Sequence, residues 1–432
     1  MENIQHIVAL EIGSTKVVGA IAEKNASGYL SVSHLEEEPL ADCVRYGIVK
    51  NVENTKAAIV RIIKKLENKV DGDITDVYVG INGRSLHSIP TEVDRNLNIS
   101  ETITKQNIDN LRQSAFKEPA TPYEPIDIVP QAYFVDNAES ANPVGCCGGS
   151  IKIKFNRIVA KPTLKLNLDR AMGALRVKKT LVTSLAMAES ILTEEERTLG
   201  CMLVDMGAET TTVAIYKKGT LHYMTTLPFG GRNLTLDIVN GLQNTTLAKA
   251  EVVKKTIAEP LSLNADDISV GEVSAKAAIN YIFSRTSEII TNVNKQIEYA
   301  HLQSGDVKTI VLAGGASKLK GLQAEFKEKT KIETRMATTP PTINILNHEI
   351  NKFEYIQVFA LLTKAASIIA DGSTCVRRRI AEPGDGPTVN TGGNAAPQVE
   401  KPKVEEKPKK SKMSKLKSWF DSLVNEDDSD NY

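Results

Sequence analysis

The sequence predicts an α/β protein made of two similar halves, followed by a disordered linker and a C-terminal amphipathic helix. Three observations lead to this prediction. Apolar runs typical of buried strands alternate with segments of helical periodicity. Two strand–turn–strand segments, residues 7–30 and 201–224, resemble each other along their whole length. After about residue 380 the chain is rich in Pro, Gly and charge and lacks the periodicity that a buried core requires.

The two similar segments share one pattern: an apolar strand, an acidic residue, a Gly two positions later, a small polar turn and a second strand. They read "IVALEIGSTKVVGAIAEKNASGYL" and "CMLVDMGAETTTVAIYKKGTLHYM". Laid one over the other, they place Glu11 on Asp205 and Gly13 on Gly207. Self-similarity of this kind indicates a duplicated half-molecule.

The turn of each hairpin carries residues that suit a phosphate group. Gly lets the backbone approach phosphate oxygens without a Cβ in the way, and N–H and hydroxyl groups donate to them. The candidates are Gly13, Ser14, Thr15 and Lys16 in the first hairpin and Gly207, Ala208, Glu209, Thr210, Thr211 and Thr212 in the second. The acids Glu11 and Asp205 are placed to hold Mg²⁺ through water. An ordinary β-hairpin explains either segment alone, but two alike favour phosphate binding.

A third element, "TIVLAGGASKLKGL" from Thr309 to Leu322, reads as a buried strand that runs through Gly314 and Gly315 into a helix start. Such a turn brings bare backbone close to a flat ligand such as adenine or ribose. An ordinary strand-to-helix turn is the better explanation of this element when it is taken alone. The prediction of a nucleotide site therefore depends on all three elements together.

The segments between these elements complete the α/β pattern. Helical spacing of apolar residues is found in "NTKAAIVRIIKKLENKV", "LDRAMGALRVKKTLV", "LAKAEVVKKTIAEPL" and "SAKAAINYIFSRTSEIITNVNKQIEYAHL". Residues 84–160 have a different texture, with several prolines, "NPVGCCGG" and few helical stretches. We therefore expect a small inserted domain there.

Composition excludes several classes of protein. The chain has 53 Lys+Arg and 53 Asp+Glu, so no net charge attracts nucleic acid. Its 5 cysteines show no C-x-x-C spacing, which argues against a disulfide framework and a zinc site. The first residues lack the pattern of a signal peptide, and no apolar run approaches the ~20 residues of a membrane span. We expect a cytoplasmic protein that does not bind nucleic acid.

The end of the chain, "KKSKMSKLKSWFDSLV", contains the protein's 1 Trp. On a helix at ~100° per residue, its apolar side chains fall within an arc of roughly 140°. They are Met413, Leu416, Trp419, Phe420, Leu423 and Val424, and the nearby lysines are Lys410, Lys412, Lys415 and Lys417. A basic amphipathic helix of this kind is predicted to bind anionic membrane lipids. The alternative is a helix that packs on the body or on a partner.

Two phosphate hairpins followed by a strand-Gly-Gly element resemble the actin/Hsp70/sugar-kinase ATPase superfamily and, within it, the FtsA family of bacterial cell-division proteins. The stretches "VPQAYFVDNAESANPVG", "SILTEEERTLGCMLVDMG" and "LPFGGRNLTLDIVNGLQNTTLAKAEVVK" carry the resemblance to FtsA. It covers about residues 7–370. It implies an actin/Hsp70-like ATPase fold with an FtsA-type inserted 1C subdomain, which binds ATP and Mg²⁺ in a central cleft.

The resemblance also implies how the chain is divided. Subdomain 1A would comprise 1–83, 161–200 and 346–380, with 1C at 84–160, 2A at 201–234 and 305–345, and 2B at 235–304. The linker would span 381–411, the membrane-targeting helix 412–425 and an acidic tail 426–432.

Site residues are carried over in the same way. The resemblance implies phosphate contacts from Gly13, Ser14, Thr15, Lys16, Asp205, Gly207, Thr211 and Thr212, with Gly230 and Gly231 following the second hairpin. It implies ribose and base contacts from Glu251, Lys254, Arg285 and Glu288, adenosine contacts from Gly314, Gly315 and Ala316, and Mg²⁺ held through water by Glu11 and Asp205. For the four helix residues, a solvated charge on a helix face is an equal alternative.

The second hairpin departs from the family pattern at Ala208 and Glu209, where consecutive glycines are usual. We expect these positions to favour open backbone angles, and a carboxylate at Glu209 either repels phosphate or turns outward. No residue marks a group that orients an attacking water, so no catalytic residue is predicted. Binding of ATP is therefore expected, with at most weak hydrolysis.

The implied function is an ATP-binding, polymerising adaptor that tethers the tubulin-like FtsZ to the cytoplasmic face of the inner membrane at the division septum and recruits later division proteins. The FtsZ C-terminal peptide would dock on residues 235–303, and copies of this chain would stack through residues 84–160. The alternative is a catalytically active ATPase or kinase of the same superfamily. The sequence shows neither the acceptor site nor the general base that a kinase requires.

Overall fold

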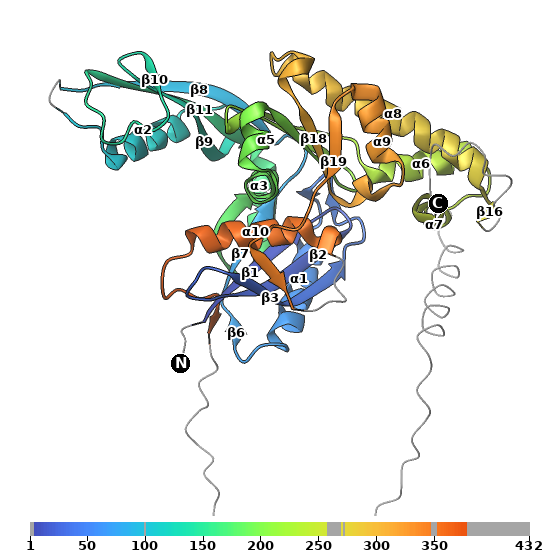
Figure 1. The fold of residues 1–432 in the computed structure, drawn as a ribbon. Helices are drawn as coiled ribbons and strands as arrows, with labels where there is room; N and C mark the ends of the chain where they lie inside the picture. Colours follow the sequence, from blue (N-terminus) through green and yellow to red (C-terminus); the bar gives the residue numbers. More distant parts are fainter. Residues whose placement is uncertain (1–3, 99–100, 257–268, 271–272, 347–351, 378–432) are drawn as a thin grey trace, which may run out of the picture. The chain divides into compact units, whose positions relative to one another are not determined.

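The computed structural model describes residues 4–98, 101–256, 269–270, 273–346 and 352–377 (Figure 1). The predicted linker, membrane-targeting helix and acidic tail lie outside these residues, and so do all the predicted membrane-binding side chains from Lys410 to Val424. Within the described part of the chain, no helix has both the length and the apolar character needed to cross a membrane.

The first half is built on a six-stranded sheet with the order β12-β7-β1-β2-β3-β20. Its strands are β1 (Gln5–Ile12), β2 (Lys16–Lys24), β3 (Leu30–Pro39), β7 (Asp76–Ile81), β12 (Arg176–Val182) and β20 (Ile343–Ile345). β1, β2 and β3 form an antiparallel meander, and β7 and β12 run parallel to β1. All side chains from Ile7 to Leu10 are fully buried, because a sheet with parallel central strands is covered on both faces.

Helices α1 (Val52–Glu67), α4 (Thr183–Ile191) and α10 (Ile356–Ile368) cover this sheet. α1 packs on β2 and β3. α10 packs on β1, β2 and β7, and α4 packs against α10. Asn51 caps α1 by accepting from the N–H of Asn54 at 3.0 Å, and Ile59, Ile62 and Leu66 form its buried stripe. Helical spacing and cap together explain why the predicted helix forms here.

The second half repeats the first. Its strands are β13 (Cys201–Met206), β14 (Thr211–Lys217), β15 (Thr220–Leu227), β18 (Thr309–Ala313) and β19 (Glu333–Met336). The order β19-β18-β13-β14-β15 matches β12-β7-β1-β2-β3, with the same strand directions. Glu11 pairs with Val18 in one hairpin and Asp205 with Thr212 in the other, so the registers agree as well. The predicted duplication is confirmed.

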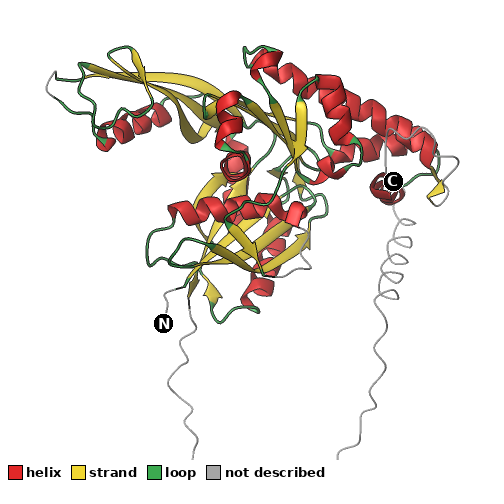
Figure 2. Cartoon of the chain, in the orientation of Figure 1, coloured by secondary structure: helices red, strands yellow, loops and turns green. Residues whose placement is uncertain are grey.

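Four helices pack on one side of the second sheet, and Figure 2 shows them near its strands. They are α6 (Gly231–Gly241), α7 (Leu247–Thr256), α8 (Ala275–Tyr299) and α9 (Leu322–Thr330). α6 packs against α7 and α8, and α8 packs against α9. Ile282, Ile289, Val293 and Phe326 are among the fully buried side chains of this half's core.

The inserted domain lies between β7 and α3 (Pro162–Met172). It consists of β8 (His87–Asn96), α2 (Lys105–Lys117), β9 (Glu124–Val135), β10 (Ala138–Ser140) and β11 (Ser150–Ala160). It has its own apolar cluster around Ile151, Ile153 and Phe155, which confirms that an inserted domain is present. One residue pair, Thr225 with His87, joins β8 to β15. The domain therefore extends the sheet of the second half into nine strands, although the chain enters it from the first half.

Two sequence-based expectations differ from the structure. The predicted helix "LDRAMGALRVKKTLV" ends at Met172, because Gly173 adopts φ 61° and closes the helix, and the remainder forms β12 beside β7. β20, expected in subdomain 2A, pairs with β3 in the sheet of the first half. The remaining elements are β4 (Val44–Arg45), β5 (Ile48–Val49), β6 (Asp73–Ile74), α5 (Glu194–Leu199), β16 (Ser269–Val270), β17 (Val273–Ser274), β21 (Val376–Arg377) and the 3-10 turns η1 (Ser304–Asp306), η2 (Gly315–Lys318) and η3 (Lys352–Tyr355).

Candidate nucleotide site between the two halves

The two predicted phosphate hairpins close with the same backbone hydrogen bond. The N–H of Gly13 donates to the Lys16 carbonyl at 3.0 Å, and the N–H of Gly207 donates to the Thr210 carbonyl at 2.8 Å. This equivalence confirms the predicted alignment of the two turns. It also places Glu209 at the position that Thr15 occupies in the first hairpin.

The backbone at Ala208 and Glu209 is ordinary. Neither residue has a positive φ, so the expectation of open backbone angles at these positions is wrong. The hydrogen bond from the Gly207 N–H to the Thr210 carbonyl closes this four-residue turn, which needs no residue in the left-handed conformation. The glycine that this region does require is Gly230, because a Cβ there would lie 2.6 Å from the carbonyl carbon of Ala208.

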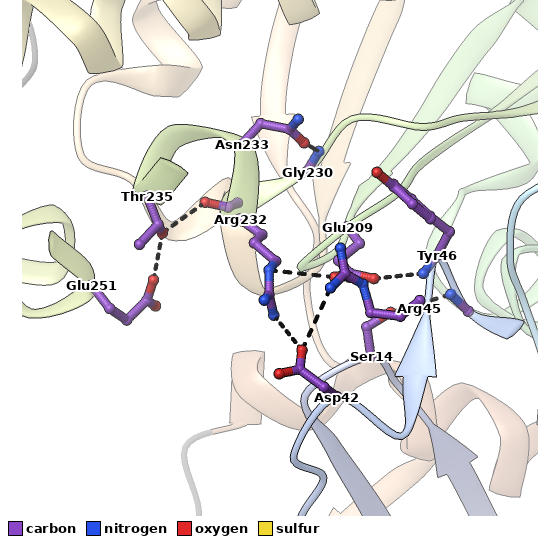
Figure 3. A network of polar contacts seen from close by, with 12 residues as sticks. Ser14, Asp42, Arg45, Tyr46, Glu209, Gly230, Arg232, Asn233, Thr235 and Glu251 are labelled. Carbon is purple, nitrogen blue, oxygen red and sulfur yellow. Dashed lines mark hydrogen bonds and ion pairs between the residues drawn. The ribbon is translucent and has the colours of Figure 1, made fainter. Parts of the chain in front are cut away.

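Helix α6 begins directly against the second hairpin (Figure 3). The N–H of Gly231 donates to the Gly207 carbonyl at 3.0 Å, and the N–H of Arg232 donates to the Ala208 carbonyl at 2.6 Å. The Asn233 side chain accepts from the N–H of Gly230 at 2.9 Å, which caps the helix. The predicted residues Gly230 and Gly231 therefore lie at the tip of the hairpin.

The acids of the two hairpins interact with each other, Asp205 from a buried position and Glu11 from a half-buried one. Asp205 is 1% exposed and accepts from Gln357 Nε2 at 3.0 Å and from Asn82 Nδ2 at 3.4 Å. Burial raises the pKa of Asp205 to about 6, although the Gln357 hydrogen bond opposes the shift. Burial, together with the charge of Asp205, raises the pKa of Glu11 to about 8 against the opposing effect of Lys16. Two carboxylates that resist ionising together suit a divalent cation, which stabilises their charged forms.

No three His, Cys, Asp or Glu side chains of the described residues gather into a cluster that could ligate a metal directly. Glu11 and Asp205 are therefore suited to Mg²⁺ that keeps most of its water, as Mg²⁺ sites commonly do. Their role as Mg²⁺ residues stays a prediction.

The strand-Gly-Gly element lies against one of these acids, Asp205. Gly314 has φ 85°, and a Cβ there would lie 2.4 Å from the Met206 carbonyl oxygen and 2.5 Å from Asp205 Oδ1. Only glycine fits this position, because the backbone angle and the close approach both exclude a side chain. Ala316 in η2 lies beside Gly231, whose Cβ would be 3.3 Å from the Ala316 methyl. The structure thus brings the predicted adenosine residues to the start of α6.

Glu251 and Lys254 on α7 contact the first turn of α6. Lys254 Nζ donates to the Gly231 carbonyl at 3.0 Å, to Thr235 Oγ1 at 3.0 Å and to Glu251 Oε2 at 2.6 Å. Burial lowers the pKa of Lys254 despite its acidic partner. Lys254 lowers the pKa of Glu251 although burial opposes this. The alternative of a solvated charge on a helix face is therefore wrong for Lys254, whereas the Glu251 side chain is still 37% exposed.

Arg285 and Glu288 on α8 lie in a different environment. Arg285 donates through Nε and Nη2 to Asp237 at 2.5 and 2.8 Å and through Nη1 to Glu288 at 2.5 Å. These residues line an open groove of about 470 Å³ with Tyr281 and neighbours on α6. Neither makes a hydrogen bond or an ion pair to Glu251 or Lys254 among the described residues, so the four predicted helix residues form two separate sites.

Several predicted phosphate ligands use their side chains for other contacts. Lys16 pairs with Glu37 at 2.6 Å and Glu354 at 3.2 Å, and these acids raise its pKa although burial would lower it. Thr211 donates to the Phe229 carbonyl at 2.8 Å, and Thr212 donates to Asn82 Oδ1 at 2.9 Å. Ser14 accepts from the N–H of Gly47 at 3.2 Å, and Thr15 is exposed. As positioned, the two threonines hold the hairpin in place.

Sequence reasoning missed the residues that surround Glu209 (Figure 3). The Glu209 side chain is 3% exposed and reaches Arg45, Tyr46 and Arg232. The expectation that it turns outward is therefore wrong. Sequence reasoning also missed Asn82 and Gln357, whose side-chain amides donate to Asp205. Asn82 had a usable signal, because "NG" directly follows the buried strand β7 as Gly314 follows β18. Arg45 and Gln357 had none, since their partners are remote in sequence.

A five-strand unit repeated twice, with an acid at the first hairpin of each copy, defines the class: an actin/Hsp70-like ATPase fold. The chain resembles the solved structure of the PilM-PilN type IV pilus biogenesis complex, with a TM-score of 0.61 and 16% identity over 83% of this chain and 98% of that chain. This likeness concerns the fold alone.

Sequence comparison identifies the family. The family model "Cell division protein FtsA" matches residues 202–360, and "SHS2 domain inserted in FTSA" matches residues 83–159. Cell division protein FtsA of Porphyromonas gingivalis is 28% identical, covering 74% of this chain and 70% of the relative. FtsA of Escherichia coli K12 is 26% identical, covering 87% of this chain and 93% of the relative. The chain belongs to the FtsA family of cell division proteins.

Proposed function

We propose that this chain binds ATP with Mg²⁺ between its two halves and acts as a polymerising adaptor that tethers FtsZ to the cytoplasmic face of the membrane at the division septum. One observation carries the nucleotide part. The acids Glu11 and Asp205 meet at equivalent hairpins, beside a glycine, Gly314, where no side chain fits. Such bare backbone next to paired acids suits a phosphate chain with its cation.

The residues present fit both groups. The turns at Gly13 and Gly207 allow a close approach of backbone to phosphate oxygens, and Gly314 lets its own strand end pack directly against Asp205 and the Met206 carbonyl. Glu11 and Asp205 would hold water bound to Mg²⁺, which supplies positive charge for the phosphates. Lys254, held by Glu251 at the start of α6, would lie on the side of the nucleoside.

Titration calorimetry of the full-length chain tests this part. Preformed MgATP should bind the wild-type protein, and Asp205→Asn should weaken binding because it removes a charge from the cation site. Lys179→Gln is a suitable control, since this exposed residue lies on β12, away from the hairpins. Equal affinities for all three proteins would contradict the proposal. Phosphate release of about one per second or faster without partners would favour the alternative, a catalytic ATPase or kinase.

The proposed docking surface for the FtsZ C-terminal peptide is the groove between α6 and α8. Tyr281 there is 37% exposed, and Arg285 adds a cation. Arg285→Glu should remove the cation that pairs with Asp237 and Glu288, make the groove more negative and abolish binding of a labelled FtsZ peptide, measured by fluorescence anisotropy. A reversal on the inserted domain, Lys154→Glu, should leave the titration unchanged. Identical curves for wild type and Arg285→Glu would place the peptide elsewhere.

Membrane tethering is assigned to the C-terminal helix, which lies outside the described residues. Its Trp419 is the 1 Trp of the chain, so tryptophan fluorescence reports on this predicted helix alone. Vesicles with anionic lipid should shift the emission to the blue, and removal of residues after Lys410 should abolish recovery of the protein with vesicles. An unshifted spectrum would contradict the anchor. Recruitment of later division proteins and stacking of copies through the inserted domain complete the proposal.

A further inference from the structure

The Glu209 side chain crosses from the second half to the first. It leaves the tip of the second hairpin and ends at the turn between β4 and β5, where Tyr46 has φ 53° and Gly47 has φ 74°. That turn lies on the first phosphate hairpin, because Gly47 donates its N–H to Ser14 Oγ at 3.2 Å (Figure 3). The carboxylate of Glu209 is therefore located between the two hairpins that would receive the phosphate chain.

The groups around this carboxylate are the ones that proteins use to bind phosphate. Glu209 Oε2 accepts from the N–H of Tyr46 at 2.5 Å. Glu209 Oε1 lies 2.9 Å from Arg45 Nε and 3.6 Å from Arg232 Nε. Guanidinium groups and backbone N–H groups that converge on one point are the typical donors to a phosphoryl group. We call Arg45, Arg232 and the Tyr46 N–H the arginine pocket.

The carboxylate fills the arginine pocket incompletely. Arg45 Nε and Arg232 Nε are both buried, yet neither makes a hydrogen bond of good geometry to any group of the described residues. A single carboxylate oxygen, Oε1 of Glu209, lies within ion-pair distance of both atoms. A carboxylate presents two oxygens in a plane, whereas a terminal phosphate presents three oxygens around one atom and more negative charge. The pocket thus has more donor capacity than its present occupant uses.

Asp42 holds the two arginines at their other ends. Its Oδ1 lies 3.0 Å from Arg232 Nη1 and 3.6 Å from Arg45 Nη1. The arginines would therefore stay together if Glu209 moved away, since Asp42 bridges them independently. A pocket that keeps its shape after losing one anion is able to bind another.

We propose that the arginine pocket is a binding site for the terminal phosphate of a nucleoside triphosphate, and that the Glu209 carboxylate occupies it when that phosphate is absent. This inference rests on the proposed nucleotide function. Glu209 belongs to one half, and Arg45 with Tyr46 belongs to the other, so exchange of the carboxylate for phosphate replaces an ion pair built into the chain by a diffusible ligand. A diphosphate would lack the displacing group. Glu209 thereby makes the protein respond to the third phosphate.

Glu209→Gln removes the competing charge with little change of shape. In calorimetry on the full-length protein, this variant should bind MgATP about tenfold more tightly than wild type, which corresponds to about 1.4 kcal/mol. Its affinity for MgADP should change by less than about twofold. Arg45→Gln, which keeps Glu209 in place, should instead weaken MgATP and leave MgADP unchanged. Glu38→Gln is the matched control, because Glu38 is also buried and also pairs with two cations, Arg61 and Lys65, outside the site.

Inorganic phosphate separates this inference from the proposed function. Phosphate should raise the melting temperature of Glu209→Gln more than chloride does at equal ionic strength, and this gain should vanish in Glu209→Gln/Arg232→Gln. If no variant binds nucleotide but phosphate still stabilises Glu209→Gln through the arginines, the proposed function fails and the pocket stands. Equal gains for MgATP and MgADP, or no gain for MgATP and none for phosphate, would overturn the inference and leave Glu209 as a structural ion pair.

Discussion

Binding of Mg²⁺ at the acid pair should release a proton, and Glu11 should be its source. Burial and the charge of Asp205 raise the pKa of Glu11 to about 8, so at pH 7 this carboxyl is about nine-tenths protonated. The positive charge of Mg²⁺ favours the ionised carboxylate, so binding should release about 0.9 proton for each nucleotide bound. Asp205 has a pKa of about 6 and is about nine-tenths ionised already, so it adds only about 0.1.

The affinity for MgATP should therefore rise with pH up to about 8. Each unit by which the pH falls below about 8 adds about 1.4 kcal/mol to the free energy of removing the proton from Glu11. The affinity for MgATP should therefore fall by up to about tenfold per pH unit. The rise should level off above pH 8, where the carboxyl is ionised before the ligand arrives.

Calorimetry at pH 7 in two buffers with different ionisation enthalpies measures this release directly. Preformed MgATP should release about one proton from the wild-type protein and about 0.1 from Glu11→Gln. Glu38→Gln should behave as wild type, because Lys65 holds the pKa of Glu38 below its ordinary value and this carboxyl is ionised at pH 7. The same release from wild type and Glu11→Gln would refute the assignment of the proton to Glu11.

Three further outcomes are expected. Gly314→Ala should lower the free energy of unfolding by about 1–3 kcal/mol and abolish MgATP binding. Gly28 has a similar φ of 82° but nothing within 4 Å of the added Cβ, so Gly28→Ala should lower the free energy of unfolding by less. Equal melting temperatures for the two variants would contradict the steric argument. Folding raises the pKa of Glu11 from 4.5 to about 8, so its contribution to the free energy of unfolding falls as the pH rises from 4.5 to 8. In urea titrations, the free energy of unfolding of Glu11→Gln should therefore increase relative to that of wild type by up to about 1.4 kcal/mol per pH unit in this range. Asn156→Ala should cost about 1–3 kcal/mol by thermal denaturation because Asn156 Nδ2 donates to the buried Leu221 carbonyl at 2.7 Å, while exposed Asn110→Ala should be neutral; no difference would show that this contact does not hold the inserted domain.

The nucleotide site could be predicted from the sequence to the extent that it is local. Glu11, Gly13, Asp205 and Gly207 were found because acid and glycine stand two residues apart at the end of an apolar strand, in both copies. Gly314 was found for a related reason, since a glycine after a buried strand indicates a close approach of backbone. Where the pattern was ambiguous, the prediction failed: the segment after Gly173 has helical spacing but forms β12, because its place beside β7 outweighs its weak helical preference.

The partners of these residues could not be predicted in the same way. Asp205 is held by Gln357, and Lys16 by Glu354, each from the far end of the chain. Arg285 and Lys254 look alike as cations on helix faces, yet Arg285 lines an open groove and Lys254 is half-buried and donates to the first residue of α6. Such differences depend on which helix face meets which neighbour, and that is a property of packing.

The sequence by itself determined the two-half α/β plan, the pair of hairpins with their acids, the glycine turn and the inserted domain, because each follows from the order of neighbouring residues. Only the tertiary structure decided where Glu209 points. From its position in a turn, the sequence predicted that the Glu209 carboxylate would either repel phosphate or face water. In the folded chain it is buried against Arg45, Tyr46 and Arg232, because folding brings together a turn of each half. Charge–charge contacts between remote segments exist only once the chain has folded.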